Sequence, residues 1–350
     1  VPAHPARLRL DWGCVPLERG THPMPPCHLE FASPLGFWEV RRQAELKGEV
    51  RVYPNLQSDR KQVAAMFLRR GGVGMQVRRQ VGKGREFEKL RDYLPGDSAE
   101  DIHWKATAKR GRPVTKVFRI ERTQEVYVLL DASRLSARIV GRSWRSEQAV
   151  EDMDGGDVPG RGATVLERHL TAALMLGMAA EQQGDHFGLV TFSDQVRNFL
   201  RARRGRAHHG ACREAIYALQ PRLVAPDFDE VCSYLRTRLR RRALLVILTA
   251  LDDPVLAESF VRNVSLLSRQ HLVLTGMIRP PGVGPIFAGA EPESVEDIYG
   301  RLSGHLRWHD LQELQRVLKH RGVTFSLLEH ERMTAELVSQ YLEVKQRQLL

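Results

Sequence analysis

The sequence predicts an α/β protein with a doubly wound, mainly parallel sheet, preceded by a small β-rich domain. From Gln124 onward, short apolar stretches alternate with longer amphipathic ones, which is the pattern of parallel strands joined by crossover helices. Before residue 58, short apolar pieces are broken by Pro and Gly, as is typical of short strands joined by turns. A sheet of this kind binds ligands outside the carboxyl ends of its strands.

The strands are predicted from nearly continuous apolar runs, because strands buried on both faces do not alternate in polarity. They are Glu125–Leu130, Phe187–Phe192, Ala243–Thr249, Leu272–Ile278 and Thr324–Leu328. The helices are predicted from apolar residues spaced three or four positions apart. They are Val165–Gln183, His209–Leu219, Asp227–Arg240, Pro254–Arg269, Asp310–His320 and Met333–Arg347.

The domain boundaries follow from the change in pattern. We expect residues 1–57 to form a β-sandwich-like domain. Residues 58–81, a short helix-like piece (Lys61–Arg70) that runs into Gly71, Gly72 and Gly74, are expected to form a linker. Residues 82–350 would then form the sheet domain, opening with a segment at 82–122 that packs around it. The N-terminal region, which starts at Val1 and is rich in proline, leads us to expect that a further segment precedes it in the natural protein.

Composition limits the class of protein. With 350 residues, of which 42% are hydrophobic, the chain can bury a large core, and no apolar stretch approaches the roughly 18 residues that span a bilayer. We therefore expect a soluble fragment. The net charge of +11 suits an acidic protein, an anionic membrane surface or nucleic acid. The basic run Arg236–Arg242 lies at a predicted helix end and has no interleaved aromatic residues, which disfavours nucleic acid.

Motifs for catalysis are absent. Gly82-Lys83 is not a phosphate-binding loop, because Val77 stands where the first glycine should be and no Ser or Thr follows. The sequence has no G-x-S-x-G elbow and no H-E-x-x-H zinc helix. The four cysteines form no C-x-x-C pair, so we expect no structural zinc. These absences weaken the enzyme hypothesis without excluding it, because catalytic groups need only meet in space, and we expect a protein that is not an enzyme.

One candidate metal site follows the first strand of the sheet. Asp131, Ser133 and Ser136 would lie at its carboxyl end, and Asp252 follows the central strand Ala243–Thr249. Oxygen ligands of this kind suit Mg²⁺, which is the one cofactor that the residues suggest. The alternative is a local turn in which Asp and Ser bind nearby backbone groups.

A second candidate feature is the segment 82–122, which combines glycines, paired charges and apolar residues. We predict that it wraps the sheet domain as a structural clasp. The residues that define it are Gly82, Gly84, Glu86, Phe87, Leu90, Arg91, Tyr93, Gly96, Asp97, Ile102, Trp104, Lys105 and Lys109.

These residues carry a family resemblance. The run G-x-G-x-E-F-x-x-L-R-x-Y-x-x-G-D from Gly82, followed by I-x-W and an apolar strand that ends in D-x-S, resembles the signature of domain-of-unknown-function family 58. The pieces Arg19-Gly20 and Val52-Tyr-Pro54 resemble the β domain that precedes it there. The resemblance implies a von Willebrand A-like fold, which is Rossmann-like in its layers. It also implies association with MoxR-type AAA+ ATPases and no established catalytic activity.

The resemblance also bears on the metal site and on location. The ion-binding motif of this fold is D-x-S-x-S with an aspartate after the central strand, but Leu135 stands at the second serine and Ala250 at the aspartate. The site is therefore degenerate, and weak magnesium binding is expected. Family members carry transmembrane helices ahead of the β domain, which implies the cytoplasmic face of the bacterial inner membrane.

The resulting hypothesis is a membrane-tethered adaptor that binds a MoxR-type ATPase and a client protein through the strand ends around Asp131. The first alternative is a metal-assisted hydrolase with Asp131, Asp252 and Asp253 as ligands. The second alternative is a basic nucleic-acid-binding protein, whose binding would fall steeply with salt.

Overall fold

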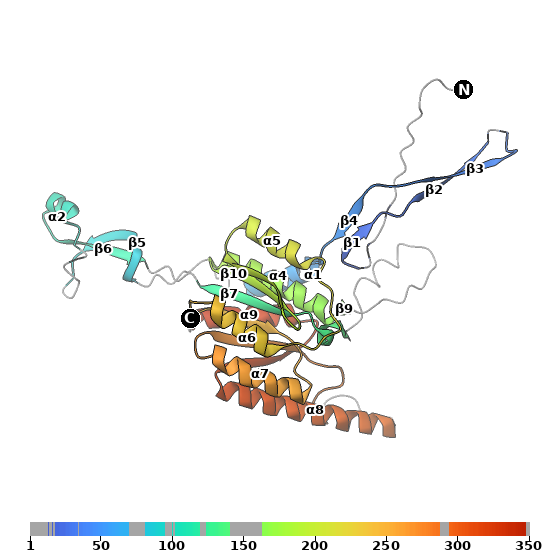
Figure 1. Cartoon of the computed structure of the whole chain (residues 1–350). Coiled ribbons are helices and arrows are strands. Elements are labelled where there is room, and N and C mark those ends of the chain that lie inside the picture. Colours follow the sequence, from blue (N-terminus) through green and yellow to red (C-terminus); the bar gives the residue numbers. More distant parts are fainter. Residues whose placement is uncertain are drawn as a thin grey trace.

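The structure, a computed structural model, describes residues 13, 16, 18–33, 35–69, 81–94, 100, 102–119, 124–140, 163–287 and 294–347. Its centre is a six-stranded sheet with the order β11-β10-β7-β12-β13-β14 (Figure 1). The strands are β7 (Glu125–Asp131), β10 (His186–Phe192), β11 (Val196–Arg203), β12 (Leu244–Leu248), β13 (Leu272–Ile278) and β14 (Val323–Leu328). All neighbours are parallel except β10 and β11. The predicted doubly wound, mainly parallel sheet is confirmed.

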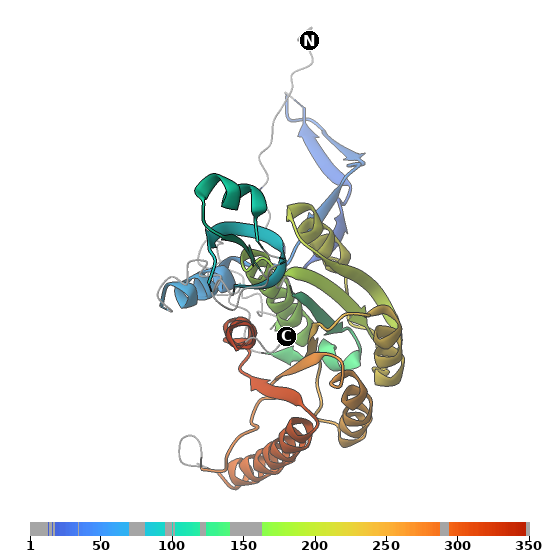
Figure 2. The same ribbon diagram turned by 90° about the vertical axis from the view of Figure 1, so that its left-hand side faces the viewer.

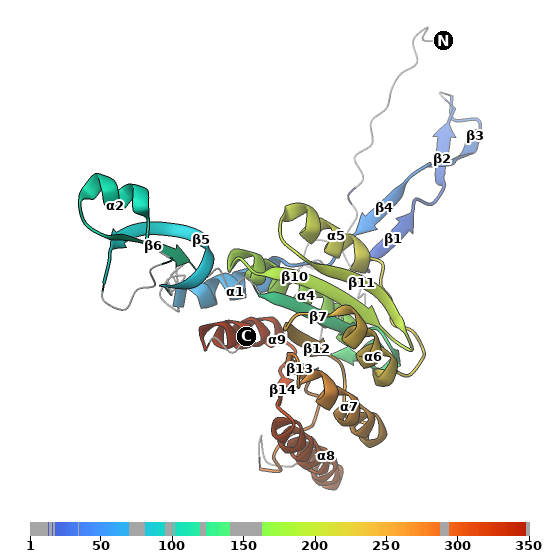
Figure 3. The same ribbon diagram turned by 60° about the vertical axis from the view of Figure 1, so that its left-hand side comes forward.

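Helices cover both faces of the sheet (Figures 1 and 3). One face carries α4 (Val165–Gln182), α5 (Arg206–Ile216), α9 (Met333–Gln346) and α1 (Gln57–Arg69). The other carries α6 (Phe228–Arg238), α7 (Pro254–Leu267) and α8 (Val295–His320). The two apolar clusters between these layers contain side chains that alternate along each strand, such as Val128 on one face and Leu129 on the other. Each central strand is therefore buried from both sides, as its continuous apolar run predicts.

Two elements differ from the sequence prediction. Strand β11 is an antiparallel edge strand whose residues are mostly half-buried or exposed, so it lacks the continuous apolar run of a central strand. Helix α8 begins at Val295, well before the predicted start at Asp310. Ser294 begins the helix in a capping box with Asp297, which is an N-terminal signal that the apolar spacing did not supply.

The N-terminal region is strand, as predicted, but the described strands do not form a sandwich. β1 (Gly20–Pro23) pairs only with β4 (Glu49–Val52), and β2 (Cys27–Ala32) only with β3 (Glu39–Ala44). Both pairs are antiparallel ribbons that extend away from the sheet domain (Figure 1), and most of their side chains are exposed. No second layer covers these ribbons within the described residues.

The base of the ribbon is fixed to the sheet domain by Arg19, which is 4% exposed. Its guanidinium donates to Glu167 of α4 at 2.6 Å and to the carbonyl oxygens of Ile216 and Tyr217 at 3.2 and 2.9 Å. Tyr53, which follows β4, packs its ring against that of Tyr217. The two N-terminal motifs identified in the sequence therefore meet at one junction with α4 and α5.

Arg19→Met is expected to lower the free energy of unfolding by about 2 kcal/mol, because it removes charge-assisted hydrogen bonds to three acceptors in a buried junction. Urea unfolding measures this change, and limited proteolysis of residues 20–52 should become faster. The control is Arg41→Met, which removes an exposed ion pair with Glu30 and should change stability by less than about 0.5 kcal/mol. Equal effects of the two substitutions would contradict the role of Arg19 in fixing the ribbon to the sheet domain.

The prediction that residues 58–81 form a linker is wrong for residues 58–69, which belong to a helix of the sheet domain. Residues 57–69 form α1, whose Val63 is 5% exposed and belongs to the core cluster beneath α4 and α9. The glycines that suggested a linker lie outside the described residues. Helix α1 is therefore part of the sheet domain's own packing.

The segment 82–122 also differs from its prediction. β5 (Val81–Asp92) and β6 (Val114–Arg119) form an antiparallel hairpin, with α2 (Trp104–Arg110) in the connection. This unit stands apart from the six-stranded sheet (Figures 1 and 3), and in Figure 2, which is seen from its side, it lies in front of the sheet domain. No helix in the described part of the chain is both long and apolar enough to cross a lipid bilayer.

Candidate functional site

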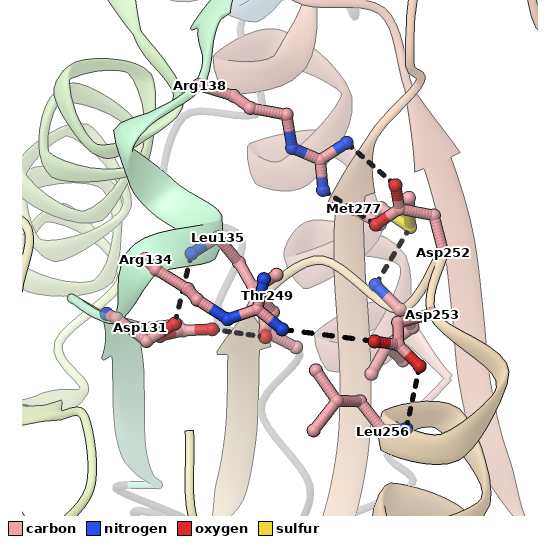
Figure 4. A network of polar contacts seen from close by, with 11 residues as sticks. Asp131, Arg134, Leu135, Arg138, Thr249, Asp252, Asp253, Leu256 and Met277 are labelled. Atoms are coloured by element: carbon pink, nitrogen blue, oxygen red, sulfur yellow. Dashed lines mark hydrogen bonds and ion pairs between the residues drawn. The ribbon is translucent and has the colours of Figure 1, made fainter. Parts of the chain in front are cut away.

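The carboxyl end of β7 carries Asp131, the central residue of the predicted site. Its side chain is fully buried. One carboxylate oxygen accepts from the backbone N–H of Ser133 at 2.8 Å, and the other accepts from the hydroxyl of Thr249 at 2.6 Å (Figure 4). Thr249 directly follows β12, so this contact joins the ends of the two central strands.

Burial raises the pKa of Asp131, although the hydrogen bonds from Ser133 and Thr249 oppose the shift. A carboxylate that is enclosed in this way cannot touch a partner protein. The prediction that Asp131 is presented on an open rim is therefore wrong. The reason is that Thr249, Ser133 and the loop after β7 close over it, and no property of β7 alone reveals this.

The two serines of the predicted metal set bind local backbone groups. Ser133 Oγ accepts from the N–H of Leu135 at 3.3 Å, and Ser136 Oγ donates to the carbonyl oxygen of Ser133 at 2.8 Å. Both serines are buried and they hold the short 3-10 helix η2 (Arg134–Ala137). The local-turn alternative describes these contacts.

Above this buried layer lies a more exposed one, formed by arginine and aspartate side chains. Arg138 binds Asp252 through two parallel hydrogen bonds of 2.7 Å each (Figure 4). Arg134 lies 3.9 Å from Asp253, whose carboxylate also caps α7 by accepting from Val255 N–H at 3.0 Å. The arginine side chains are 42% and 53% exposed.

A third group of charges continues this layer at the end of β10. Asp194 accepts from Arg197 at 2.8 Å and from Arg222 at 3.3 Å. We define the strand-end rim as seven charged side chains near the carboxyl ends of β7, β10 and β12. They lie in the loops after these strands, at the start of β11 and in the loop between α5 and α6. The members of the rim are Arg134, Arg138, Asp194, Arg197, Arg222, Asp252 and Asp253.

The rim is held in a fixed geometry by backbone contacts. Arg134 N–H donates to the carbonyl oxygen of Val224 at 3.0 Å, and Arg222 N–H donates to that of Ala132 at 2.8 Å. In the third loop, Leu251 N–H lies 3.3 Å from the sulfur of Met277. The loop after β7 is therefore tied to the loop between α5 and α6, and the loop after β12 is tied to β13.

Arginines of the rim contribute to lowering the pKa values of two rim aspartates. Although partial burial alone would raise the pKa of Asp252, hydrogen bonds and charge from Arg138, with a smaller contribution from Arg307, lower it overall. The hydrogen bond from Ser193 and the nearby Arg197 lower the pKa of Asp194. Asp194 and Asp252 are thus ionised and paired at neutral pH.

The donor set does not fit a magnesium ion. Both oxygens of Asp131 already accept hydrogen bonds, the serine hydroxyls are bound to backbone groups, and Asp252 is held by Arg138. Within the described ranges, no three His, Cys, Asp or Glu side chains come together in a way that could hold a metal. Asp131, Asp252 and Asp253, the ligands of the hydrolase alternative, are each engaged by a different partner.

The predicted clasp folds on itself where it is described. Ile102 bridges to Thr115, and the N–H of His103 donates to the carbonyl oxygen of Val114 at 2.8 Å. Trp104 is 70% exposed, and Tyr93, Lys105 and Lys109 are exposed as well. The prediction that this segment wraps the sheet domain as a clasp is therefore wrong for its described residues.

The other clasp residues are less fully described. Gly82, Gly84, Glu86 and Phe87 lie in β5, and Leu90 and Arg91 are half-buried near the end of that strand. Gly96 and Asp97 lie outside the described residues. The hairpin register pairs Glu86 with Arg119 and Phe87 with Phe118. Antiparallel pairing thus satisfies this backbone within the unit itself.

Two residues that organise this site, Thr249 and Arg138, were not predicted as site residues from the sequence. Thr249 was predicted only as the last residue of a strand, although a hydroxyl at the carboxyl end of the central strand was a usable signal. Arg138 gave no signal, because its partner Asp252 is 114 positions away. Such a pair is visible only after the sheet has aligned the two loops.

The sequence profile described as "Protein of unknown function DUF58" matches residues 89–151 and 161–281, together more than half of the chain. No curated protein matches the sequence.

Several solved structures are similar in fold. The SpRpn10 VWA domain is 12% identical, with a TM-score of 0.35 over 62% of this chain and 95% of that one. BatB from Bacteroides thetaiotaomicron is 13% identical, with a TM-score of 0.37 over 63% and 99%. An aerotolerance-related membrane protein from Bacteroides fragilis NCTC 9343 is 14% identical, with a TM-score of 0.36 over 63% and 98%.

Proposed function

The chain belongs to the DUF58 family, and from that premise we propose that it is a non-catalytic protein-binding module whose partner docks on the strand-end rim. The observation that carries the proposal is the layer of half-exposed arginines paired with aspartates at the carboxyl ends of the parallel strands. This is where open α/β sheets bind their ligands. Arginine is also enriched among the residues that dominate the energy of protein interfaces.

The rim is suited to binding because it is already organised. Its guanidinium groups are held by carboxylates and by loops that share backbone hydrogen bonds, so little side-chain freedom remains to be lost on association. The buried contact between Asp131 and Thr249 supports the loops from below. In this proposal Asp131 is a positioning residue and the arginines are the contact residues.

The partner that we propose is a MoxR-type AAA+ ATPase, with a client protein delivered to or from it. A partner surface that carries acidic residues would complement the net charge of +11 and the exposed parts of the rim arginines. We further propose that the protein works as an adaptor at the cytoplasmic face of the bacterial inner membrane, tethered ahead of its β-rich region. Metal-dependent hydrolysis is not supported by the positions of Asp131, Asp252 and Asp253.

The proposal is tested by the double substitution Arg134→Glu/Arg138→Glu. It should weaken binding of the MoxR-type ATPase by at least about tenfold, because it reverses two charges at the docking surface and places them beside Asp252 and Asp253. Calorimetric titration of the purified proteins, with and without ATP, measures the effect. Circular dichroism should show that the fold is retained.

The matched control is Arg236→Glu/Arg240→Glu, which makes the same charge change at the exposed end of α6. It should leave the affinity within about twofold of the original. Asp131→Ala is unsuitable as a test, because it removes buried hydrogen bonds and would disturb the rim indirectly. Equal binding by the rim variant and the unaltered protein would refute the docking surface.

A further inference from the structure

Arg134 differs from the other arginines of the strand-end rim in its hydrogen bonds. The other three donate to Asp194 or Asp252 at 2.7–3.3 Å. The guanidinium of Arg134 lies 3.9 Å from a carboxylate oxygen of Asp253, which is too far for a hydrogen bond (Figure 4). Within the described residues, the N–H groups of this guanidinium therefore have no hydrogen-bond acceptor.

Two exposed aliphatic residues lie close to Arg134. The side chain of Leu223 is 89% exposed and that of Val255 is 76% exposed. Leu223 precedes Val224, whose carbonyl oxygen accepts from the Arg134 N–H at 3.0 Å. Val255 donates its N–H to one oxygen of the Asp253 carboxylate, and the Arg134 guanidinium lies beside the other oxygen. The loop between α5 and α6 and the start of α7 thus each bring an exposed apolar residue to Arg134.

These three residues, which we call the Arg134 site, combine apolar surface with hydrogen-bond donors that lack acceptors. An exposed leucine or valine is ordinary by itself. A protein that covered Leu223 and Val255, however, would also remove water from the guanidinium of Arg134. A charged group that loses its water without gaining a hydrogen-bond partner is strongly destabilised. A partner that binds here must therefore supply an acceptor.

We infer that the partner places a carboxylate on Arg134 and apolar side chains on Leu223 and Val255. The inference rests on the docking surface proposed above and adds the chemistry of the segment that this surface recognises. That segment carries an aspartate or glutamate next to apolar residues. A guanidinium binds a carboxylate through two parallel hydrogen bonds, and exclusion of water by the apolar contacts strengthens them.

The aspartates of the rim disfavour a polyanionic ligand. Asp194, Asp252 and Asp253 lie in the same rim as Arg134, and all three carry arginine contacts. They would repel the closely spaced phosphates of nucleic acid or of an anionic membrane. A single carboxylate can reach Arg134 without approaching all three aspartates, so the charges favour a protein segment.

The first experiment tests the apolar contacts with the MoxR-type ATPase as the probe. Leu223→Ser/Val255→Ser should weaken binding by at least about thirtyfold in calorimetric titration, because two apolar side chains are no longer buried on association. Both side chains are exposed, so circular dichroism should show an unchanged fold. The control is Val40→Ser/Leu46→Ser in the N-terminal region, where the side chains are 42% and 43% exposed. It should leave the affinity within about twofold of the original.

The second experiment compares two arginines of the rim. Arg134→Gln should weaken binding of the ATPase by at least about tenfold, because the partner's carboxylate loses its charged donor. Arg197→Gln should weaken it by less than about threefold, because the Arg197 guanidinium already donates to Asp194 at 2.8 Å. Equal effects of the two substitutions would show that the rim acts through its overall charge and not through Arg134.

The third experiment identifies the carboxylate. The Arg134→Lys variant carries a primary amine, and carbodiimide treatment of its complex with the ATPase should join position 134 to an aspartate or glutamate of the ATPase through an amide bond. Mass spectrometry of the digested product locates the link. The control is Arg236→Lys at the exposed end of α6, which should give no link to the ATPase. A complex that forms without a link at position 134 would contradict the carboxylate contact.

The inference and the docking surface fail in different ways. If the ATPase does not bind the unaltered chain, or binds Arg134→Glu/Arg138→Glu equally well, both are refuted. If that variant loses binding while Leu223→Ser/Val255→Ser keeps it, the docking surface stands and the inference is overturned. Displacement of the ATPase by RNA or by anionic vesicles would assign Arg134 to phosphate groups and would also overturn the inference.

Discussion

Asp185→Ala is expected to lower the free energy of unfolding by about 3–5 kcal/mol, because it removes the shared acceptor of a buried charged cluster. The Asp185 side chain is 1% exposed and lies at the start of β10. One carboxylate oxygen accepts from the Gln124 N–H at 3.2 Å, and the other from the Tyr341 hydroxyl at 2.5 Å and the Lys345 ammonium at 2.8 Å. The residue therefore joins α9 to the amino ends of β7 and β10.

Urea unfolding would measure this loss, and two further variants separate its causes. Tyr341→Phe removes one hydrogen bond and keeps the buried ring, so it should cost about 1–3 kcal/mol. Lys345→Met leaves the carboxylate without its counter-ion and should cost more than Tyr341→Phe. The control Asp310→Ala removes an exposed aspartate and should change stability by less than about 0.5 kcal/mol. A loss below about 1 kcal/mol for Asp185→Ala would contradict the proposed role.

Acid sensitivity is expected from His169 in α4. Its ring is 1% exposed, and neither ring nitrogen has a hydrogen-bond partner in the part of the chain that the structure describes. Burial lowers its pKa from 6.5 to about 3. The unfolded chain binds this proton near pH 6.5, whereas the folded protein binds it only near pH 3. The stability that the neutral imidazole contributes is therefore complete above pH 6.5 and is lost as pH falls toward 3.

The size of this effect follows from linkage. Stability should fall by about 1.4 kcal/mol per pH unit in this window, or about 3 kcal/mol by pH 4.5, from His169 alone. His271, whose pKa is lowered chiefly by burial, acts in the same direction. His169→Leu keeps the site apolar and should remove this share of the pH dependence.

The measurement compares the two proteins by urea unfolding at several pH values from 7 to about 4.5. The difference in free energy of unfolding between His169→Leu and the unaltered protein should grow steadily as pH falls, because the carboxylates contribute equally to both. His320→Leu, which replaces an exposed histidine, provides the control. A difference that is constant with pH would show that His169 is accessible to protons in the folded state.

The amino-acid sequence by itself determined the layered core of this protein. Runs such as Leu244–Leu248 are apolar throughout because both of their faces are covered. A continuous apolar run can be recognised in the sequence without coordinates. The same holds for α9, whose apolar spacing gave its position almost to the residue. The matched profile covers the part of the family resemblance from Leu90 onward, and it does not cover Gly82–Phe87 or the N-terminal pieces.

Only the tertiary structure decided what the strand ends do. Asp131 was identified from its position after β7, but its burial depends on Thr249, which the sheet brings to it from 118 positions away. The Arg138–Asp252 pair and the exposed residues beside Arg134 likewise depend on which loops and faces remain open after packing. Local sequence fixes where a strand or helix forms, whereas exposure and pairing depend on distant segments whose placement is settled only when the layers close.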